Sequence, residues 1–131
     1  MISVEHVSKS FGTRQILRDV SLSVGKGETM VILGASGSGK STLLKMIIGL
    51  LRPDSGRVMV NGQDITRLSN SKVPYYRRKL GIVFQDFRLL EDKTVYENVA
   101  FVLRVTGAKS REIRERTSHV LNLVGLRGKE N

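Results

Sequence analysis

The sequence predicts an α/β fold that begins with an antiparallel β portion and ends in helices. Three observations support this prediction. Apolar and polar residues alternate in the first thirty residues, a glycine-rich loop at residues 34–41 separates an apolar run from an amphipathic segment, and helical periodicity follows residue 94. Periods of two and of 3.6 residues are the primary signals of strands and helices, and this order of elements indicates a layered α/β domain.

The first thirty residues are predicted to form strands. Residues 2–7 indicate one strand, and residues 20–24 alternate valine and leucine with serine as a half-buried strand does. Phe11 and Gly12 are expected in the turn between these strands. The next apolar run, Met30–Leu33, is continuous and ends at a glycine. Such a run predicts a strand buried on both faces of a mixed or parallel sheet.

A helix is predicted directly after the glycine-rich loop, and a hairpin after the helix. Pro53 lies just beyond the helical pattern, where helices usually stop. Val58 and Val60 then lead into Asn61-Gly62, which is a strong signal for a tight hairpin turn. The residues expected on one buried face of the helix are Leu43, Leu44, Ile47, Ile48 and Leu51.

The second half of the chain is predicted to contain one buried strand and two helices. The strand is Leu80–Phe84, which ends at Gln85. Thr94 and Glu97 have the spacing of a capping box at the start of a helix. A last helix is expected from Ser110 to a stop at Gly125. The expected apolar faces contain Val95, Val99, Val102 and Leu103 in the first helix, and Ile113, Thr117, Val120, Leu121 and Val124 in the second.

The composition is that of an ordinary soluble globular protein. The chain has 131 residues, of which 40% are hydrophobic and 26% are charged, enough for one domain with a core. It contains no apolar run of about 18 residues, so no membrane-spanning helix is predicted. The first ten residues lack the apolar core of a secretory signal. The absence of cysteine excludes disulfides and thiolate metal sites. These features fit a cytoplasmic protein.

The formal net charge of +10 leaves several interpretations open. A basic surface attracts nucleic acid, anionic lipid or nucleotide phosphates, but it is equally consistent with a solvated face. Basic residues cluster at positions 67–79 and 109–116 without interleaved stacking aromatics, and the chain has no tryptophan. Nucleic-acid binding is therefore the weakest of these interpretations, and no nucleic-acid partner is predicted.

The glycine-rich loop matches the Walker A pattern, Gly34-x-x-x-x-Gly39-Lys40-Ser41. Glycines allow the backbone to curl so that its N–H groups approach phosphate oxygens, and the helix that follows directs its positive end to the same place. Lys40 is predicted to contact the β and γ phosphates of ATP, and Ser41 to supply a hydroxyl to Mg²⁺. The alternative is a flexible Gly/Ser turn that precedes a helix by chance.

The chain resembles ABC ATPases (ATP-binding-cassette ATPases) along its whole length. The resemblance rests on the Walker A loop and on its surroundings. These are residues 7–12 (VSKSFG), Gly27-Glu28, residues 33–44 (LGASGSGKSTLL), residues 51–57 (LRPDSGR) and residues 83–86 (VFQD). It implies a P-loop NTPase core with an N-terminal antiparallel β portion and the start of a helical subdomain, in incomplete form. Residues 1–85 are expected to be the core, and residues 86–131 to begin the helical part.

The resemblance also implies roles for individual residues. Phe11 is expected to stack on the adenine ring, although the bare sequence is equally consistent with a core phenylalanine in a turn. Gln85 is expected to contact Mg²⁺ and the attacking water; from the sequence alone it is only a polar strand end. Lys40 and Gln85 are the expected catalytic contacts. The expected nucleotide contacts besides Phe11 are Gly34, Ala35, Ser36, Gly37, Ser38, Gly39, Lys40, Ser41 and Thr42.

Within the family, residues 73–78 and 83–101 look most like the cell-division ATP-binding proteins of the FtsE type. That resemblance implies a homodimer of cassettes that works with an FtsX-like integral membrane permease. It also implies a peripheral location on the inner face of the bacterial cell membrane. Residues 1–56 are less distinctive and resemble the ATPases of phospholipid and amino-acid importers nearly as well, so an importer subunit is the alternative.

Several elements of the family pattern are absent from the sequence. There is no LSGGQ-type signature, no apolar strand ending in Asp-Glu and no switch histidine; His6 and His119 lie in the wrong places and are expected to be structural. The resemblance therefore implies a chain that binds nucleotide weakly and does not turn it over alone, with a core open at the missing strands. A hypothesis of another class is a truncated, non-catalytic module that docks on a membrane protein.

Overall fold

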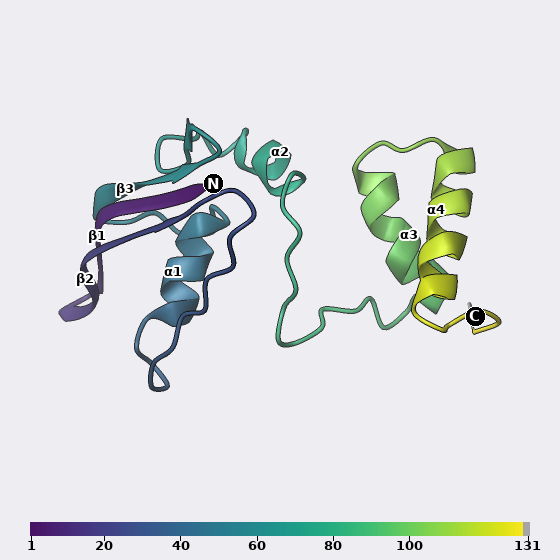
Figure 1. The fold of residues 1–131 in the computed structure, drawn as a ribbon, viewed down its shortest axis with the longest axis horizontal. Helices are drawn as coiled ribbons and strands as arrows, with labels where there is room; N and C mark the ends of the chain where they lie inside the picture. Colours follow the sequence, from purple (N-terminus) through teal and green to yellow (C-terminus); the bar gives the residue numbers. More distant parts are fainter. Residues whose placement is uncertain (130–131) are drawn as a thin grey trace. The chain divides into compact units, whose positions relative to one another are not determined.

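The computed structural model describes residues 1–129 and divides the chain into two compact units, Met1–Leu80 and Gly81–Asn131. The strands and the glycine-rich loop belong to the first unit, and the two longest helices belong to the second (Figure 1). The boundary lies slightly before residue 85, after which the sequence analysis places the start of the helical part.

The first unit is built on a four-stranded antiparallel sheet, so the predicted antiparallel start of the fold is confirmed. The strand order is β2-β1-β3-β4, and β1 is hydrogen-bonded to β2 on one side and to β3 on the other. Phe11 ends β1 and is paired with Arg14, so the turn of the β1–β2 hairpin is Gly12-Thr13. The bounds are Ile2–Phe11 for β1, Arg14–Val24 for β2, Ser55–Val60 for β3 and Gln63–Asp64 for β4.

The predicted hairpin at Asn61-Gly62 is confirmed and connects β3 to β4. Both residues have positive φ, 48° for Asn61 and 79° for Gly62. Two consecutive left-handed residues form the tight turn whose twist matches that of antiparallel strands, and asparagine and glycine tolerate this conformation best. The local sequence therefore determines this hairpin.

Two helices complete the first unit: α1 (Lys40–Ile47) and α2 (Val73–Arg77). α1 packs against β3. α2 closes the C-terminal end of α1, where the Tyr76 hydroxyl donates to the Ile47 carbonyl and the Arg77 guanidinium donates to the carbonyls of Ile48 (3.1 Å) and Gly49 (2.8 Å). These donors satisfy carbonyls that a helix end leaves unpaired. The buried core residues are Val4, Val7, Leu17, Leu43, Met46, Val58, Val60, Ile65, Leu68 and Tyr76.

The buried face of α1 differs from the predicted one. Leu43 is buried as expected, but Leu44 is 52% exposed, and the unpredicted Met46 is buried instead. The helix ends at Ile47, and Gly49 has a φ of 69°, so Leu51 lies beyond the helix. Ile47 and Leu51, both predicted on this face, are partly buried and pack against the core, so the prediction is wrong only for Leu44 and for the omission of Met46. α2 was not predicted, although Pro74 in its first turn is a position that proline favours.

The two predicted buried strands, Met30–Leu33 and Leu80–Phe84, are wrong for this structure. Neither segment is a strand, and within residues 1–129 no strand pairs with either of them. Val31 is 73% exposed, Leu33 is 87% exposed and Val83 is fully exposed. A strand buried on both faces requires hydrogen-bonding neighbours, because unpaired backbone groups are costly to bury. The described residues supply no such neighbours, so neither segment forms a strand, although Ile32 and Leu80 are partly buried against the core.

The second unit is a pair of packed helices, α3 (Val95–Val105) and α4 (Ser110–Leu123). The predicted capping box at the start of α3 is confirmed. The Glu97 N–H donates to Thr94 Oγ1 (3.2 Å), and the Thr94 N–H donates to Glu97 Oε2 (3.1 Å). α4 begins at Ser110 as predicted, and Gly125, with a φ of 74°, follows its end.

The buried stripes of α3 and α4 are narrower than predicted. Ala100, Thr117 and Leu121 are buried, whereas Val102 (63% exposed), Val120 (41%) and Val124 (60%) are exposed. A pair of packed helices buries one line of contact on each helix, so within this unit the outer part of each apolar face is exposed. The buried Thr117 hydroxyl has no hydrogen-bond partner among the described residues. None of the described helices is long and apolar enough to cross a membrane.

Two ion pairs connect β1 to neighbouring segments of the first unit. Lys9 Nζ lies 2.5 Å from Asp54 Oδ1, and Arg57 Nε lies 2.5 Å from Glu5 Oε2. The hydrogen bond from Lys9 lowers the pKa of Asp54 from its ordinary value of 3.8. The hydrogen bond from Arg57 likewise lowers the pKa of Glu5 from 4.5. Both carboxylates are therefore held in their charged forms by the folded state.

These lowered pKa values predict an acid-sensitive contribution to stability. A carboxylate whose pKa is lower in the folded state contributes to the free energy of unfolding above its unfolded pKa, and loses that contribution as pH falls through the folded pKa. Urea unfolding of the wild type and of a Glu5→Gln/Asp54→Asn variant will test this. We expect their difference to be constant above about pH 5 and to shrink below about pH 4. A difference that stays constant down to pH 3 would contradict the assignment.

Candidate functional site

The glycine-rich loop, Gly34–Gly39, curls immediately before α1 and is visible below that helix in Figure 1. Gly37 and Gly39 have φ values of 78° and 94°, in a region that other residues rarely adopt. A Cβ atom on Gly34 would lie 2.6 Å from Ser38 Oγ, so a larger residue there would require the Ser38 hydroxyl to rotate away. The shape of the loop therefore requires glycine at positions 37 and 39.

Gly39 anchors the loop to the sheet. A Cβ atom at this buried glycine would lie 2.7 Å from Leu17 Cδ2 and 3.2 Å from the Ile16 carbonyl oxygen. Ile16 and Leu17 belong to β2, just after the hairpin turn, and Leu17 is paired with Lys9 of β1. β2 therefore contacts both parts of the site. It pairs with the end of β1 that leads to Phe11, and it packs against Gly39, the last residue of the loop before α1.

The Lys40 ammonium lies inside the curl of the loop. It donates to the carbonyls of Gly34 (2.7 Å) and Ala35 (2.8 Å) and lies 3.3 Å from Ser38 Oγ. An ammonium has three donors, and here all of them face oxygen atoms of the loop. The positive charge is thus held at the centre of the curl, where an anion that enters the loop meets it.

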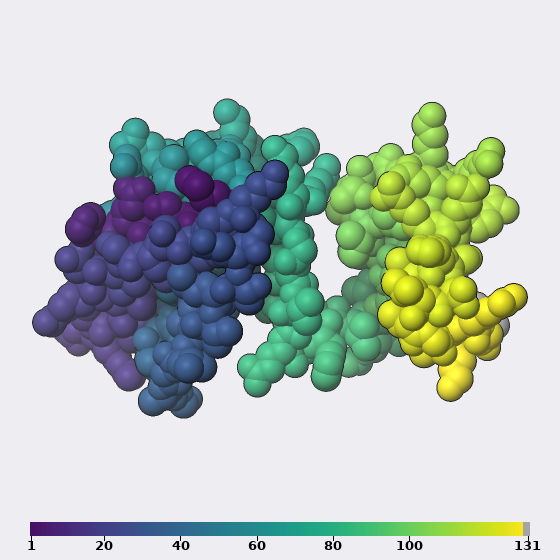
Figure 2. All heavy atoms as spheres, in the orientation of Figure 1, coloured from purple at the N-terminus to yellow at the C-terminus, as the bar shows by residue number. Residues whose placement is uncertain are grey.

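The start of α1 adds further donors at the same place. Gly39 is the N-cap residue, and no side chain caps the helix. The backbone N–H groups of Lys40, Ser41 and Thr42 precede the first intrahelical bond, which Leu43 N–H makes to the Gly39 carbonyl (2.9 Å). Figure 2 shows the loop at the surface of the first unit, and its residues Gly34–Ser38 are exposed, as is Ser41. Free amides, a helix N-terminus and an ammonium together form a site for an anion.

The donor set also fits Mg²⁺ when the metal is bound together with phosphate. Among the described residues, no group of three His, Asp or Glu side chains is placed to hold a metal ion. Mg²⁺ in nucleotide sites usually takes one or two protein ligands and completes its octahedron with phosphate oxygens and water. The exposed hydroxyl of Ser41, in the first turn of α1, is suited to be such a ligand.

Phe11 lies at the end of β1 and is not a core residue. Its side chain is 52% exposed, and Lys9 Nζ lies 5.6 Å from the centroid of its ring. The alternative of a core phenylalanine is therefore wrong for this structure. An exposed ring at the hairpin end is free to stack on a flat ligand, and the adenine contact of Phe11 stays a prediction.

Gln85 belongs to the second unit, and its side chain is exposed. The residues that follow it form an unusual turn, in which Phe87 and Arg88 have φ values of 50° and 51°. The Arg88 guanidinium lies 3.9 Å from the centroid of the Phe84 ring and bonds to Asp86. These contacts describe the residues on either side of Gln85 in the sequence. The expected contact of Gln85 with Mg²⁺ stays a prediction.

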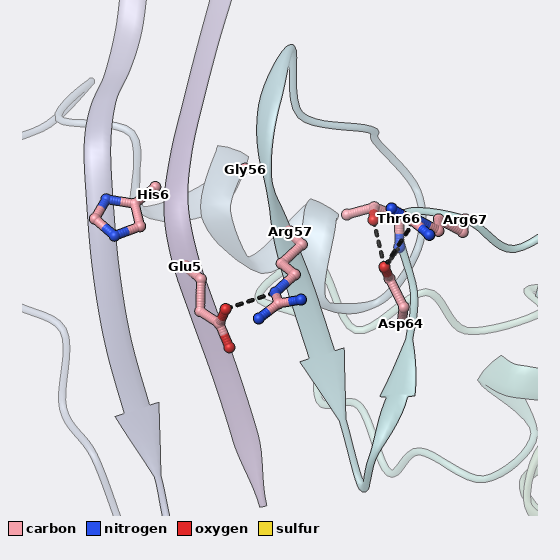
Figure 3. A pocket seen from close by; sticks show the side chains of 7 residues that line it. All are labelled: Glu5, His6, Gly56, Arg57, Asp64, Thr66 and Arg67. Atoms are coloured by element: carbon pink, nitrogen blue, oxygen red, sulfur yellow. Dashed lines mark hydrogen bonds and ion pairs between the residues drawn. The ribbon is translucent and has the colours of Figure 1, made fainter.

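A hollow on the sheet has a volume of about 360 Å³, and no residue of the glycine-rich loop lines it (Figure 3). Its charged groups are already paired. Arg57 bonds to Glu5, and the backbone N–H and hydroxyl of Thr66 donate to Asp64, the former at 2.9 Å. His6 also lines it, but its ring bonds to Asp19 (2.7 Å). Arg67, the remaining charged residue of the lining, pairs with Asp64 (3.4 Å). Each charged group around this hollow therefore already has at least one partner.

Comparison with known proteins places the loop in a family. A family profile described as "ABC transporter" matches residues 17–131, which is most of the chain. The chain belongs to the ABC transporter family. The predicted family is therefore confirmed, and so is the predicted α/β fold class, because the solved structures that resemble this ABC chain are ABC cassettes.

Curated relatives of this ABC chain fall into two groups. The cell division ATP-binding protein FtsE of Escherichia coli K12 is 50% identical over 127 residues, which are 96% of this chain and 57% of that protein. FtsE of Mycobacterium tuberculosis is 43% identical over the whole chain and 58% of its own length. The methionine import ATP-binding protein MetN of Photobacterium profundum is 43% identical over the whole chain and 39% of its own length. The chain thus spans less than two thirds of these relatives.

The solved structures that resemble this ABC chain include a nucleotide-bound one. The dimeric structure of MJ0796, a bacterial ABC transporter cassette, has a TM-score of 0.87 at 33% identity, over 99% of this chain and 60% of that chain. A post-hydrolysis state of the same cassette, bound to ADP and Pi, has a TM-score of 0.86 at 32% identity, with the same coverage.

Some residues around the loop were not identified from the sequence. Ile16 and Leu17 pack closely against Gly39 of the loop. Lys9 lies over the Phe11 ring and pairs with Asp54. These contacts join residues far apart in the chain, and no local pattern signals them. The family resemblance includes both segments, residues 7–12 and 51–57, but it does not indicate that Lys9 and Asp54 pair.

Proposed function

We propose that this chain binds ATP with Mg²⁺ through residues 34–42, as the nucleotide-holding part of an ABC ATPase subunit. The observation that carries the proposal is the placement of the Lys40 ammonium inside a loop whose next residues present the free N–H groups of α1. Both donor types serve phosphate oxygens. Membership of the ABC transporter family supports ATP as the nucleotide.

Each residue of the proposed site has a separate role. Lys40 neutralises charge on the β and γ phosphates, and the loop and helix amides, from Gly34 to Thr42, bind the remaining phosphate oxygens. Ser41 offers its hydroxyl to Mg²⁺, which supplies charge neutralisation at the phosphates when it is bound. Phe11 stacks on the base. By its resemblance to the family's Q-loop residue, Gln85 contacts Mg²⁺ and orients the attacking water.

We further propose a role in bacterial cell division, as the FtsE-like subunit of a complex with an FtsX-like integral membrane permease. The identity of 50% to E. coli FtsE supports this proposal. In such a complex two cassettes dimerise on ATP at the inner face of the cell membrane. The second candidate is an importer subunit, which identities of 43–47% to MetN proteins support.

Hydrolysis is proposed for the assembled complex and not for this chain alone. Catalysis of phosphoryl transfer depends on positioning and on charge stabilisation. Lys40 supplies charge, but the sequence has neither an apolar strand ending in Asp-Glu nor an LSGGQ-type signature. We therefore expect nucleotide binding by the isolated chain without turnover.

Calorimetric titration with ATP, ADP and AMP in excess Mg²⁺ tests the proposed function. Because the loop contacts phosphates, we expect ATP and ADP to bind more tightly than AMP. Equal affinities for the three would contradict a phosphate-directed site. A membrane-protein contact that is indifferent to ATP, together with no nucleotide binding, would instead favour the non-catalytic docking module.

A further inference from the structure

Asp54 holds the end of β1 that leads to Phe11. Its Oδ1 lies 2.5 Å from Lys9 Nζ, and its Oδ2 accepts a 2.7 Å hydrogen bond from the Ser10 N–H. Its own N–H donates to the Ser8 carbonyl (2.9 Å). A single residue from outside the strand thus contacts three consecutive residues of β1, which are the three that precede Phe11.

We call the contacts of Asp54 with Ser8, Lys9 and Ser10 the Asp54 clasp. Lys9 connects this clasp to the ring of Phe11. Its side chain is only 14% exposed, and its ammonium, which bonds to the Asp54 carboxylate, lies over the Phe11 ring, 5.6 Å from the ring centroid. A cation at this distance is attracted to the face of an aromatic ring. The ammonium therefore limits the orientations that the Phe11 ring takes, while the ring itself remains half exposed.

The clasp also connects the two ends of the proposed nucleotide site. Asp54 lies in the short connection between α1 and β3, and α1 begins at the phosphate-binding loop. Phe11 lies at the end of β1. Because Asp54 ties that connection to β1, it couples the placement of α1 to the placement of the Phe11 ring.

We propose that Asp54 and Lys9 are positioning residues for the Phe11 ring, and that they favour ligands that carry a base over ligands that carry phosphates alone. The inference rests on the proposed ATP site. It adds that the affinity for the base depends on an ion pair that touches neither the base nor the phosphates. The lowered pKa of Asp54 is consistent with a carboxylate that stays charged in this clasp.

The first unit contains a matched control for this ion pair. The Arg57–Glu5 pair has the same length of 2.5 Å and also joins β1 to another part of the unit. Glu5 also has a lowered pKa, but its partner lies on β3, and the pair is six residues from Phe11 in the strand. A loss of binding that comes from weaker attachment of β1 in general is therefore expected for both pairs, whereas the positioning role is limited to Asp54 and Lys9.

The experiment measures the affinities of the purified chain for ATP and for inorganic triphosphate, both with Mg²⁺. The variants are Asp54→Asn, Lys9→Met and the control Glu5→Gln. Asparagine at position 54 still accepts from the Ser10 N–H, so Asp54→Asn removes mainly the ion pair. We expect Asp54→Asn and Lys9→Met to weaken ATP binding by about five- to tenfold. We expect triphosphate binding to be unchanged, and Glu5→Gln to affect neither ligand.

The outcomes separate this inference from the proposed function. Failure of the wild type to bind either ligand overturns the proposed function itself. Wild-type binding of ATP with no loss in Asp54→Asn overturns the positioning role. So does an equal loss for ATP and triphosphate, or an equal loss in Glu5→Gln, because each indicates a general structural effect. If Asp54→Asn does not fold, Lys9→Met decides, since it leaves the Ser10 and Ser8 contacts of Asp54 in place.

Discussion

Replacement of Lys40 by alanine is expected to weaken ATP binding by about 100-fold and to leave the fold intact. The Lys40 ammonium is the full positive charge inside the loop, where it bonds to the Gly34 and Ala35 carbonyls. A bound triphosphate replaces these acceptors with charged oxygens, and a hydrogen bond to a charged group contributes about 1.5–3 kcal/mol. The upper end of that range corresponds to about 100-fold in the dissociation constant. Calorimetric titration of both proteins with ATP and Mg²⁺ measures the change.

Lys45→Ala is the matched control for this variant. Lys45 lies in the last turn of the same helix, is exposed, and forms no hydrogen bond through its side chain within the described residues. The substitution Lys45→Ala removes the same charge from α1 as Lys40→Ala does, but at the end of the helix far from the loop. We expect an affinity within about twofold of the wild type, since exposed charges are screened by salt. Equal losses in the two variants would show that Lys40 acts only through net charge.

Replacement of Gly56 by alanine is expected to lower the free energy of unfolding of the first unit by about 2–5 kcal/mol. Gly56 has a φ of 81°, and a Cβ atom there would lie 2.3 Å from the His6 carbonyl oxygen and 2.4 Å from that of Glu5. These are backbone atoms of β1, which lies beside β3 in Figure 3 and is hydrogen-bonded to it, so moving them aside disturbs the sheet. The loss is large compared with the total stability of a typical domain, about 5–15 kcal/mol.

Gly62→Ala separates the clash from the backbone strain. Gly62 has a similar φ of 79°, but a Cβ atom there would meet nothing within 4 Å. Its replacement is expected to cost only the strain of a left-handed alanine, about 1–2 kcal/mol. Urea unfolding curves, followed by a probe in the first unit, measure both variants. If the two losses are equal, the close approach of β1 to Gly56 does not limit stability.

Features determined by neighbouring residues were predictable from the sequence. The turn at Asn61-Gly62 and the capping box of Thr94 and Glu97 depend on backbone geometry within a few residues, and both are present. The glycine-rich loop is likewise a feature that neighbouring residues determine. Its shape follows from glycines at fixed spacing, and the helix begins at Lys40 as the spacing requires.

Features that depend on distant partners were not predictable. The apolar pattern of Met30–Leu33 predicts a buried strand, but a strand exists only where another strand pairs with it, and none of the described residues pairs with this segment. The buried face of α1 was predictable only in part: Leu43, Met46 and Ile47 share one face of the helix, whereas Leu44 lies beside that face and is exposed. The contact between Lys9 and Asp54 joins residues 45 positions apart, so no short-range pattern reveals it.

The central claim is that the loop amides and Lys40 bind the phosphates of ATP. Nitrogen–proton correlation spectra of the isotope-labelled chain, recorded during titration with ATP and Mg²⁺, test it most directly. We predict that the largest shifts appear at the amides of Gly37, Gly39, Lys40, Ser41 and Thr42. The amides around the hollow at His6 and Gly56 should stay in place. Shifts centred on that hollow, or no shifts at the loop when ATP is in large excess, would contradict the claim.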